Sequence, residues 1–205
     1  MKIKICGLRR ECDIEYVNEL LPDYIGFIFA EKSRRYVTPA EAAKLKARLD
    51  PSIEAVGVFV NAPIDRVAAL VEQQIIDAVQ LHGSEDDRYI RNLRSQTGCP
   101  ILKAFIVKDT DDVRAAEQSS ADYVLLDGGE GSGNPFDWSQ IKTLSRPYFL
   151  AGGLNLDNLE EAVQKLWPYA VDVSSGVETG GWKDYYKIKR FMEICSEQQG
   201  RRGKQ

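Results

Sequence analysis

The chain has little of what metal sites and disulfide frameworks are made from. It contains one histidine and four cysteines, and no two of the cysteines form a Cys-x-x-Cys pair. Zinc sites combine several cysteine or histidine ligands, often at short spacings, so we expect no metal site. No signal peptide precedes the first expected strand. We therefore also expect a cytoplasmic protein whose thiols are reduced.

Long apolar runs and a surplus of positive charge are missing as well. No stretch of the chain reaches the roughly 18 apolar residues that a membrane-spanning helix needs, so we expect no membrane partner. The formal net charge is −4 and the pI is about 5.2. These values argue against a nucleic-acid partner, because nucleic-acid-binding proteins usually carry a basic face. The polar, basic residues 197–205 are expected to form a frayed tail.

Short apolar segments alternate with amphipathic segments along the rest of the chain. Eight apolar segments are rich in Val, Ile, Tyr and Phe and are apolar at nearly every position, as strands buried on both faces should be. The expected strands are Lys2–Cys6, Tyr24–Phe29, Glu54–Val60, Ala78–Leu81, Ile101–Ile106, Asp122–Asp127, Tyr148–Ala151 and Ala170–Ser174.

Strict alternation of strands and helices predicts an α/β fold with a parallel sheet. Eight repeats favour closure of that sheet into a (β/α)8 TIM barrel, and an open doubly wound sheet is the alternative. The barrel would be a single short domain spanning residues 1–196, since such barrels typically have about 250 residues. No Gly-x-Gly-x-x-Gly motif follows the first expected strand, so a dinucleotide-binding fold has little support.

Helix signals support the same pattern. Thr38 and Glu41 have the spacing of a capping box, and Pro39 fits the first helical position between them. The last helix is expected to run from about Asp184 to Cys195. These helices would form the outer layer of the barrel.

Two reactive side chains stand where expected strands end, which is where such barrels place their active sites. Cys6 ends the first strand, and its thiol could act as a base if its pKa falls enough. Asp127 ends the sixth strand, and partial burial would let its carboxyl hold a proton for donation. The alternatives are an inert buried thiol and a carboxylate that caps a helix or forms an ion pair.

Small residues follow the seventh and eighth strands. Gly152 and Gly153 follow the seventh, and Ser174 and Ser175 follow the eighth. Glycines allow a ligand to approach the backbone, and free N–H groups suit a phosphate. Because the usual phosphate site of these barrels uses the same two loops, we expect a phosphate site here.

Further polar residues lie near other strand ends. Arg35, within a basic cluster, could fork onto a carboxylate, and His82 is either a ligand-binding group or a hydrogen-bonded structural one. Glu178 and Lys183, after the eighth strand, could be charges on the rim.

Taken together, these segments resemble the phosphoribosylanthranilate isomerase family of tryptophan biosynthesis. The resemblance runs from about residue 2 to residue 195, and Val79–Gly83 and Val171–Glu178 are its most specific segments. The supporting segments are Lys4–Leu8, Gly26–Phe29, Lys32–Val37, Val56–Asn61, Leu125–Asp127, Phe136–Trp138 and Gly152–Asn155.

The resemblance implies an Amadori rearrangement of a phosphorylated aminosugar, N-(5-phosphoribosyl)anthranilate. It implies that Asp127 is the acid, that Cys6 is the base and that Arg35 holds the anthranilate carboxylate. The substrate-binding residues would also include His82 and, around the phosphate, Gly152, Gly153, Ser174 and Ser175. No cofactor is expected, because the anilino nitrogen of the substrate supplies the electron pair that drives the rearrangement. The protein would be a monomer or a homodimer.

The sequence departs from the family pattern at two places. Arg9 stands where the first motif usually has threonine, and residues 131–136 contain Asn134-Pro135 within the usual glycine loop. Three other functions remain open at this point: an indoleglycerol-phosphate synthase, an epimerase, and a catalytically silent barrel that binds a phosphorylated ligand.

Overall fold

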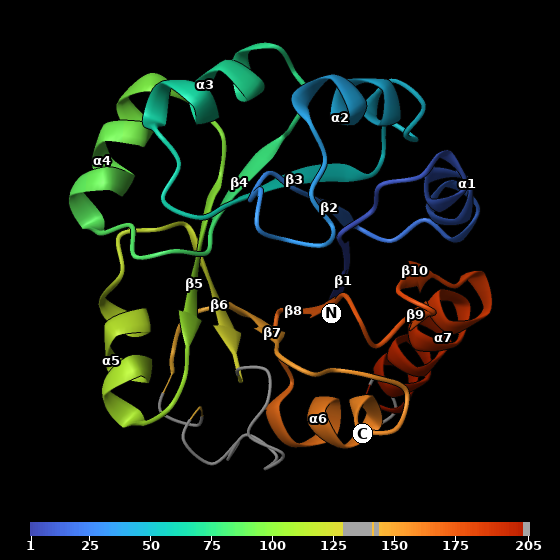
Figure 1. Cartoon of the computed structure of the whole chain (residues 1–205). Coiled ribbons are helices and arrows are strands. Elements are labelled where there is room, and N and C mark those ends of the chain that lie inside the picture. The colour runs from blue at the N-terminus through green and yellow to red at the C-terminus, as the bar shows by residue number, and fades with distance from the viewer. Residues whose placement is uncertain (129–140, 142–143, 203–205) are drawn as a thin grey trace.

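Eight parallel strands form a closed barrel in the computed structural model, which describes residues 1–128, 141 and 144–202 (Figure 1). The barrel strands are β1 (Lys2–Cys6), β2 (Tyr24–Ile28), β3 (Glu54–Phe59), β4 (Ala78–Leu81), β5 (Ile101–Ile106), β6 (Tyr123–Asp127), β7 (Tyr148–Ala151) and β8 (Ala170–Val173). Strand β1 pairs with both β2 and β8, with Cys6 opposite Gly26 on one side and Ile5 opposite Val173 on the other. The predicted TIM barrel is confirmed, and the open sheet is wrong.

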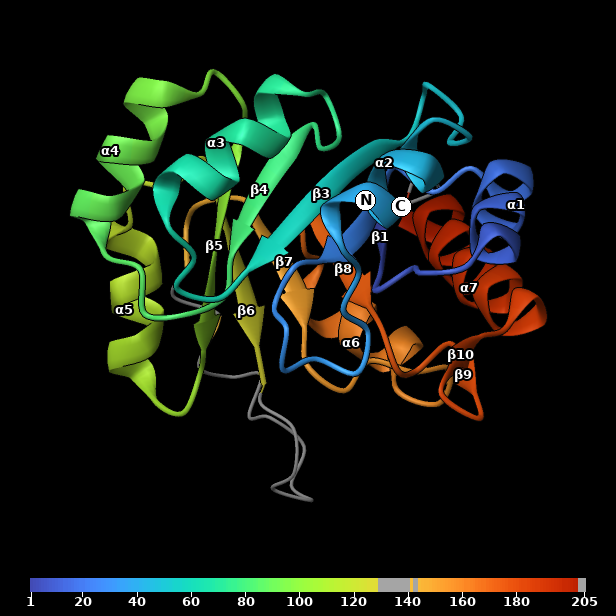
Figure 2. The same ribbon diagram turned by 45° about the horizontal axis from the view of Figure 1, so that its top comes forward.

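The helices surround the strands in chain order (Figures 1 and 2). They are α1 (Glu11–Leu20), α2 (Pro39–Lys46), α3 (Ile64–Glu72), α4 (Asp87–Gln96), α5 (Thr110–Gln118), α6 (Leu159–Leu166) and α7 (Tyr185–Arg202). A two-stranded ribbon, β9 (Glu178–Thr179) and β10 (Trp182–Lys183), lies between β8 and α7. No helix of the described residues is long and apolar enough to cross a membrane.

The start of α2 and the end of α7 test two sequence predictions. The Thr38 hydroxyl accepts a hydrogen bond from Glu41 N at 3.2 Å, and the Glu41 carboxylate accepts one from Thr38 N at 2.8 Å, which confirms the capping box. The expected end of the last helix at Cys195 is wrong, because α7 continues to Arg202. Residues 197–202 therefore belong to a helix rather than to a frayed tail. Gln198 is buried there and donates a hydrogen bond to Glu160 at 3.0 Å.

The strand residues alternate between the two faces of the barrel wall. Ile3 and Ile5 belong to the apolar layer under the helices, and Lys4 and Cys6 take the opposite, inward face. Near the amino-terminal ends of the strands the interior holds a cluster of aromatic rings, with centroids 5.3 to 5.8 Å apart. The rings belong to Tyr24, Tyr123, Phe149 and Tyr169. At the carboxyl-terminal ends the interior opens into a cavity.

Candidate active site

A cavity of about 310 Å³ lies at the carboxyl-terminal ends of the strands. It brings together all eight residues that the sequence proposes for the site. They are Cys6, Arg35, His82, Asp127, Gly152, Gly153, Ser174 and Ser175. The same wall includes Gln80 and Asp172, two buried polar residues near strand ends for which the sequence predicted no role.

Cys6 is buried in the cavity wall against β2. A Cβ atom on Gly26 would lie 2.6 Å from the Cys6 sulfur, so only glycine leaves room for the thiol there. Burial raises the pKa of the Cys6 thiol, and the ammonium groups of Lys4 and Lys183 oppose part of that rise. Asp172 also raises this pKa, so burial and one carboxylate oppose the thiolate while two cations lie where they favour it.

An ion pair inside the barrel lies close to Cys6. Lys4 Nζ is 2.9 Å from Asp172 Oδ2, and both side chains are buried. Burial alone would lower the pKa of Lys4, but the effects of Asp172 and Cys6 are larger together and raise it above its ordinary value. The other carboxylate oxygen of Asp172 is buried and has no hydrogen-bond partner among the described residues. Opposite charges two positions before Cys6 and Ser174 were the sequence signal for this pair, because alternate strand residues share a face.

Asp127 lies beside the single histidine. Its Oδ2 atom is 3.4 Å from His82 Nε2, and His82 Nδ1 is 3.4 Å from Gln80 Nε2. Gly152 packs against the same carboxyl: it has φ +85°, and a Cβ there would be 2.6 Å from Asp127 Oδ1. The side chain of Asp127 is 20% exposed, so it is accessible from the cavity.

The loops after β7 and β8 contact each other through their backbones. Gly153 has φ +70°, and a Cβ at that position would meet no atom within 4 Å. Asn155 forms a parallel bridge with Gly176, where a Cβ would lie only 2.0 Å from Leu154 O. The Ser174 hydroxyl donates to Cys6 O at 3.0 Å, which joins these loops to β1. Small residues thus leave an open, backbone-lined corner of the kind that accepts an anion.

Arg35 is held by a carboxylate on the β9–β10 ribbon. Its Nε and Nη2 atoms donate to the two oxygens of Glu178 at 2.6 and 2.8 Å. Lys183 Nζ contacts the same carboxylate at 2.7 Å and donates to Ser174 O at 2.9 Å. Burial alone would raise the pKa of Glu178, but Arg35 and Lys183 lower it to about 2. The reading of Glu178 and Lys183 as rim charges is wrong, because the ribbon folds back and buries both side chains.

The Arg9 departure has a structural explanation. The Arg9 guanidinium lies 3.8 Å from the centre of the Trp182 ring and donates to Gly181 O at 3.2 Å. Arg9 therefore fastens the loop after β1 to the β9–β10 ribbon. The second departure, Asn134-Pro135, and the motif Phe136–Trp138 lie outside the described residues.

Comparison with known proteins supports one family. A family model for N-(5'-phosphoribosyl)anthranilate isomerase matches residues 3–194. The isomerase of Endomicrobium trichonymphae is 48% identical over 198 residues, which cover 94% of this chain and 97% of that protein. The isomerase of Clostridium acetobutylicum is 45% identical over 201 residues, with 94% and 96% covered.

Solved structures give the same result. The phosphoribosyl anthranilate isomerase of Thermotoga maritima superposes with a TM-score of 0.87 at 35% identity, covering 96% of this chain and 99% of that one. An isomerase in complex with reduced 1-(o-carboxyphenylamino)-1-deoxyribulose 5-phosphate has a TM-score of 0.85 at 35% identity, with 96% and 99% covered. These matches favour the isomerase family over the indoleglycerol-phosphate synthase and epimerase alternatives. The chain belongs to the phosphoribosylanthranilate isomerase family, the enzymes that isomerise N-(5'-phosphoribosyl)anthranilate in tryptophan biosynthesis.

Proposed function

We propose that this chain catalyses the Amadori rearrangement with Asp127 as the general acid and Cys6 as the general base. The observation that carries the proposal is that one cavity contains a carboxyl, a thiol and a backbone-lined anion corner. Strands β1 and β6 are separated in the barrel by β7 and β8. An acid and a base on different parts of the wall can therefore act on different atoms of one bound sugar.

The substrate phosphate would bind at Gly152, Gly153, Ser174 and Ser175. The open space beside Gly153 supports this placement, because backbone N–H groups there can approach an anion closely. A relative has been solved with a reduced product analogue that carries a 5-phosphate. With the phosphate in this corner, the ribose would extend over the cavity floor toward Cys6 and Asp127.

In the first step, Asp127 donates its proton to the ribose ring oxygen. The lone pair of the anilino nitrogen forms a double bond to C1 as the C1–O bond breaks, so the ring opens to a cationic Schiff base. His82, 3.4 Å from Asp127, is placed to orient the carboxyl or to hold a sugar hydroxyl.

In the second step, the Cys6 thiolate removes the proton from C2. The electron pair of the C–H bond neutralises the Schiff base and gives an enolamine, which tautomerises to the ketone. The cationic intermediate adds positive charge beside Cys6, and Lys4 and Lys183 act in the same direction, against the effect of burial on the thiol pKa. Asp127 has lost a proton and Cys6 has gained one, so exchange through water resets the pair.

Arg35 would hold the anthranilate carboxylate. Glu178 fixes the guanidinium at the cavity through two hydrogen bonds. Because an arginine has five N–H donors, it can bind a second carboxylate while this contact persists. Glu178 would then be a positioning residue that presents Arg35 to the substrate.

The test follows the fluorescence decay of freshly prepared phosphoribosylanthranilate with the purified protein. We expect the wild type to accelerate the decay strongly, and the variants Asp127→Asn and Cys6→Ala to lose nearly all of that acceleration while remaining folded. Full activity in either variant would remove its assigned role. A wild type without activity would favour a silent barrel that only binds a phosphorylated ligand.

A further inference from the structure

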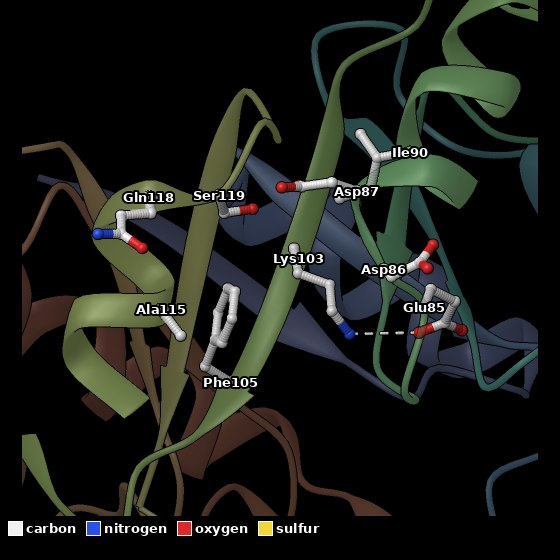
Figure 3. Close-up of a pocket in the computed structure, with 9 residues that line it drawn as sticks. All are labelled: Glu85, Asp86, Asp87, Ile90, Lys103, Phe105, Ala115, Gln118 and Ser119. Atoms are coloured by element: carbon white, nitrogen blue, oxygen red, sulfur yellow. Dashed lines mark hydrogen bonds and ion pairs between the residues drawn. The ribbon is translucent and has the colours of Figure 1, made fainter. Parts of the chain in front are cut away.

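A buried lysine on the outer face of the barrel wall contacts the backbone on either side of His82. Lys103 is on β5, and its neighbours Leu102 and Ala104 belong to the cluster inside the barrel, so Lys103 points outward. Figure 3 shows its ammonium directed at Glu85, in a second cavity of about 280 Å³ lined by residues of α4, α5 and β5. Glu85 and Lys103 are 1% and 8% exposed. The catalytic cavity does not include either residue.

The Lys103 ammonium reaches the backbone on both sides of His82. Its Nζ atom donates to Gly83 O at 2.6 Å and, at the longer distance of 3.5 Å, to Leu81 O. The same ammonium forms an ion pair with Glu85 Oε2 at 3.3 Å and lies 5.9 Å from the centre of the Phe105 ring. One cation therefore ties together the two carbonyl groups that flank the histidine.

Glu85 fixes the same segment from its other side. Its carboxylate accepts hydrogen bonds from Gly83 N at 2.8 Å and from Asn61 N at 2.6 Å. A Cβ on Gly83 would lie 2.6 Å from Asn61 Oδ1, so the loop after β4 is packed tightly against the end of β3. These contacts leave the backbone around His82 little freedom to shift.

The position of this backbone sets the contact with the proposed acid. His82 N donates to Phe59 O at 2.8 Å, and its imidazole Nε2 lies 3.4 Å from Asp127 Oδ2. A small shift of the segment would lengthen the contact with Asp127, because the imidazole moves with its backbone.

The ion pair is costly to bury, which argues that it has a purpose beyond packing. Desolvation of two charges often outweighs their attraction, and apolar residues of similar size can replace such a pair with little loss of stability. Burial lowers the pKa of Lys103, with Glu85 acting against that change.

We propose that Lys103 is a positioning residue for His82 and, through His82, for Asp127. The ammonium acts on the carbonyl groups of Leu81 and Gly83 and never touches the substrate. The inference rests on the proposed function only where it concerns turnover. The position of His82 can be measured without substrate.

The test uses the fact that His82 is the only histidine in the chain. Its imidazole gives one assignable set of NMR signals in the full-length protein. The variants are Lys103→Met, Lys103→Arg and the double variant Lys103→Met with Glu85→Gln, which removes the ammonium without leaving a buried unpaired carboxylate. Lys44→Met, at an exposed lysine on α2, is the matched control. The charged and titratable groups that share the cavity with His82 stay unchanged in all of them: Cys6, Arg35, Asp127 and Asp172.

We expect the His82 signals to move in Lys103→Met and in the double variant, and to return toward the wild-type position in Lys103→Arg. We expect kcat to fall about tenfold or more in the same two variants with a smaller change in KM, since a misplacement of about 1 Å can cost about 100-fold. Unmoved signals and an unchanged kcat in a folded double variant would overturn the proposal. If the His82 signals move as expected but no variant or wild type turns over substrate, the proposed function fails and the positioning of His82 stands.

Discussion

Near the amino-terminal ends of the strands the barrel interior is filled by aromatic rings, whereas at the carboxyl-terminal ends it holds ionisable side chains around a cavity. Phe149 contacts three tyrosine rings at the first end. At the other end Gly26, Ala151 and Gly152 leave space beside Cys6 and Asp127. The same eight strands form both ends of the barrel. The two ends differ in the side chains that the strands direct into the interior. The comparison teaches that packing at one end can stabilise a fold whose other end carries ionisable side chains around incompletely filled space.

The largest effect should come from the proposed acid. Replacing Asp127 by Asn removes the ring-opening proton, and general acid–base groups contribute about 10²–10⁴-fold to rate. We expect kcat to fall by about 10³-fold or more while the unfolding temperature stays close to that of the wild type. Fluorescence decay of the substrate and thermal unfolding measure the two quantities. A variant within tenfold of wild-type kcat would break the distinction between the two ends.

The proposed base comes next. In Cys6→Ser the hydroxyl has nearly the size of the thiol but is a much weaker acid, so far less of the basic form is available. We expect kcat to fall by about 10²-fold or more, near the lower part of the range for general bases. Cys12→Ser is the matched control, because Cys12 lies on α1 and does not line the cavity. We expect this variant to retain wild-type kcat.

The aromatic end should respond in stability rather than in rate. Phe149→Ala deletes a ring that contacts Tyr24, Tyr123 and Tyr169. Deleting a buried phenylalanine ring costs about 3–5 kcal/mol of unfolding free energy. We expect denaturant unfolding to show this loss while kcat at 20 °C stays within about twofold. A large drop in kcat in the folded variant would show that the two ends are not separable.

The smallest effect should come from the carboxylate that holds Arg35. Contact with Arg35 and Lys183 lowers the Glu178 pKa from its ordinary value of 4.5 to about 2. A lowered pKa adds stability that is fully present above pH 4.5 and is lost as the pH falls toward 2. We expect the wild type to be more stable than Glu178→Gln at pH 7, and this difference to shrink between pH 4.5 and 2. Urea unfolding of both proteins across this range checks the sign.

The same variant sharpens the assignment of Arg35. If Glu178 positions the guanidinium for the anthranilate carboxylate, Glu178→Gln should raise KM about tenfold with a smaller effect on kcat, because a charge-assisted bidentate contact becomes weaker. An unchanged KM would indicate that Arg35 does not depend on Glu178 to reach the substrate.

The sequence predicted the wall of the barrel well because that wall follows local rules. Continuous apolar runs marked all eight strands to within one residue at each end, and Thr38 with Glu41 marked the start of α2. The end of α7 was missed because Gln198 is held by side chains of α6, a contact that no local pattern contains.

The cavity was predicted less completely. The strand ends gave Cys6 and Asp127 their proposed roles, but no role was predicted for Lys4 and Asp172, which lie two positions before Cys6 and Ser174. The burial of Glu178 and Lys183 depends on a ribbon that folds back across the barrel end. The proposed role of Lys103 depends on its contact with the segment that follows β4. Charged residues inside apolar strands are the signal that would have found Lys4, Asp172 and Lys103.

The most direct test of the account is the deuterium isotope effect at C2 of the substrate. Phosphoribosylanthranilate carrying deuterium at C2 would be compared with the unlabelled compound in wild type, Cys6→Ser and Asp127→Asn. If Cys6 removes the C2 proton, its weakened variant should show a larger isotope effect on kcat than the wild type. Asp127→Asn should show no increase, because ring opening then limits the rate. The opposite pattern, with the larger isotope effect in Asp127→Asn, would contradict the assignment of acid and base.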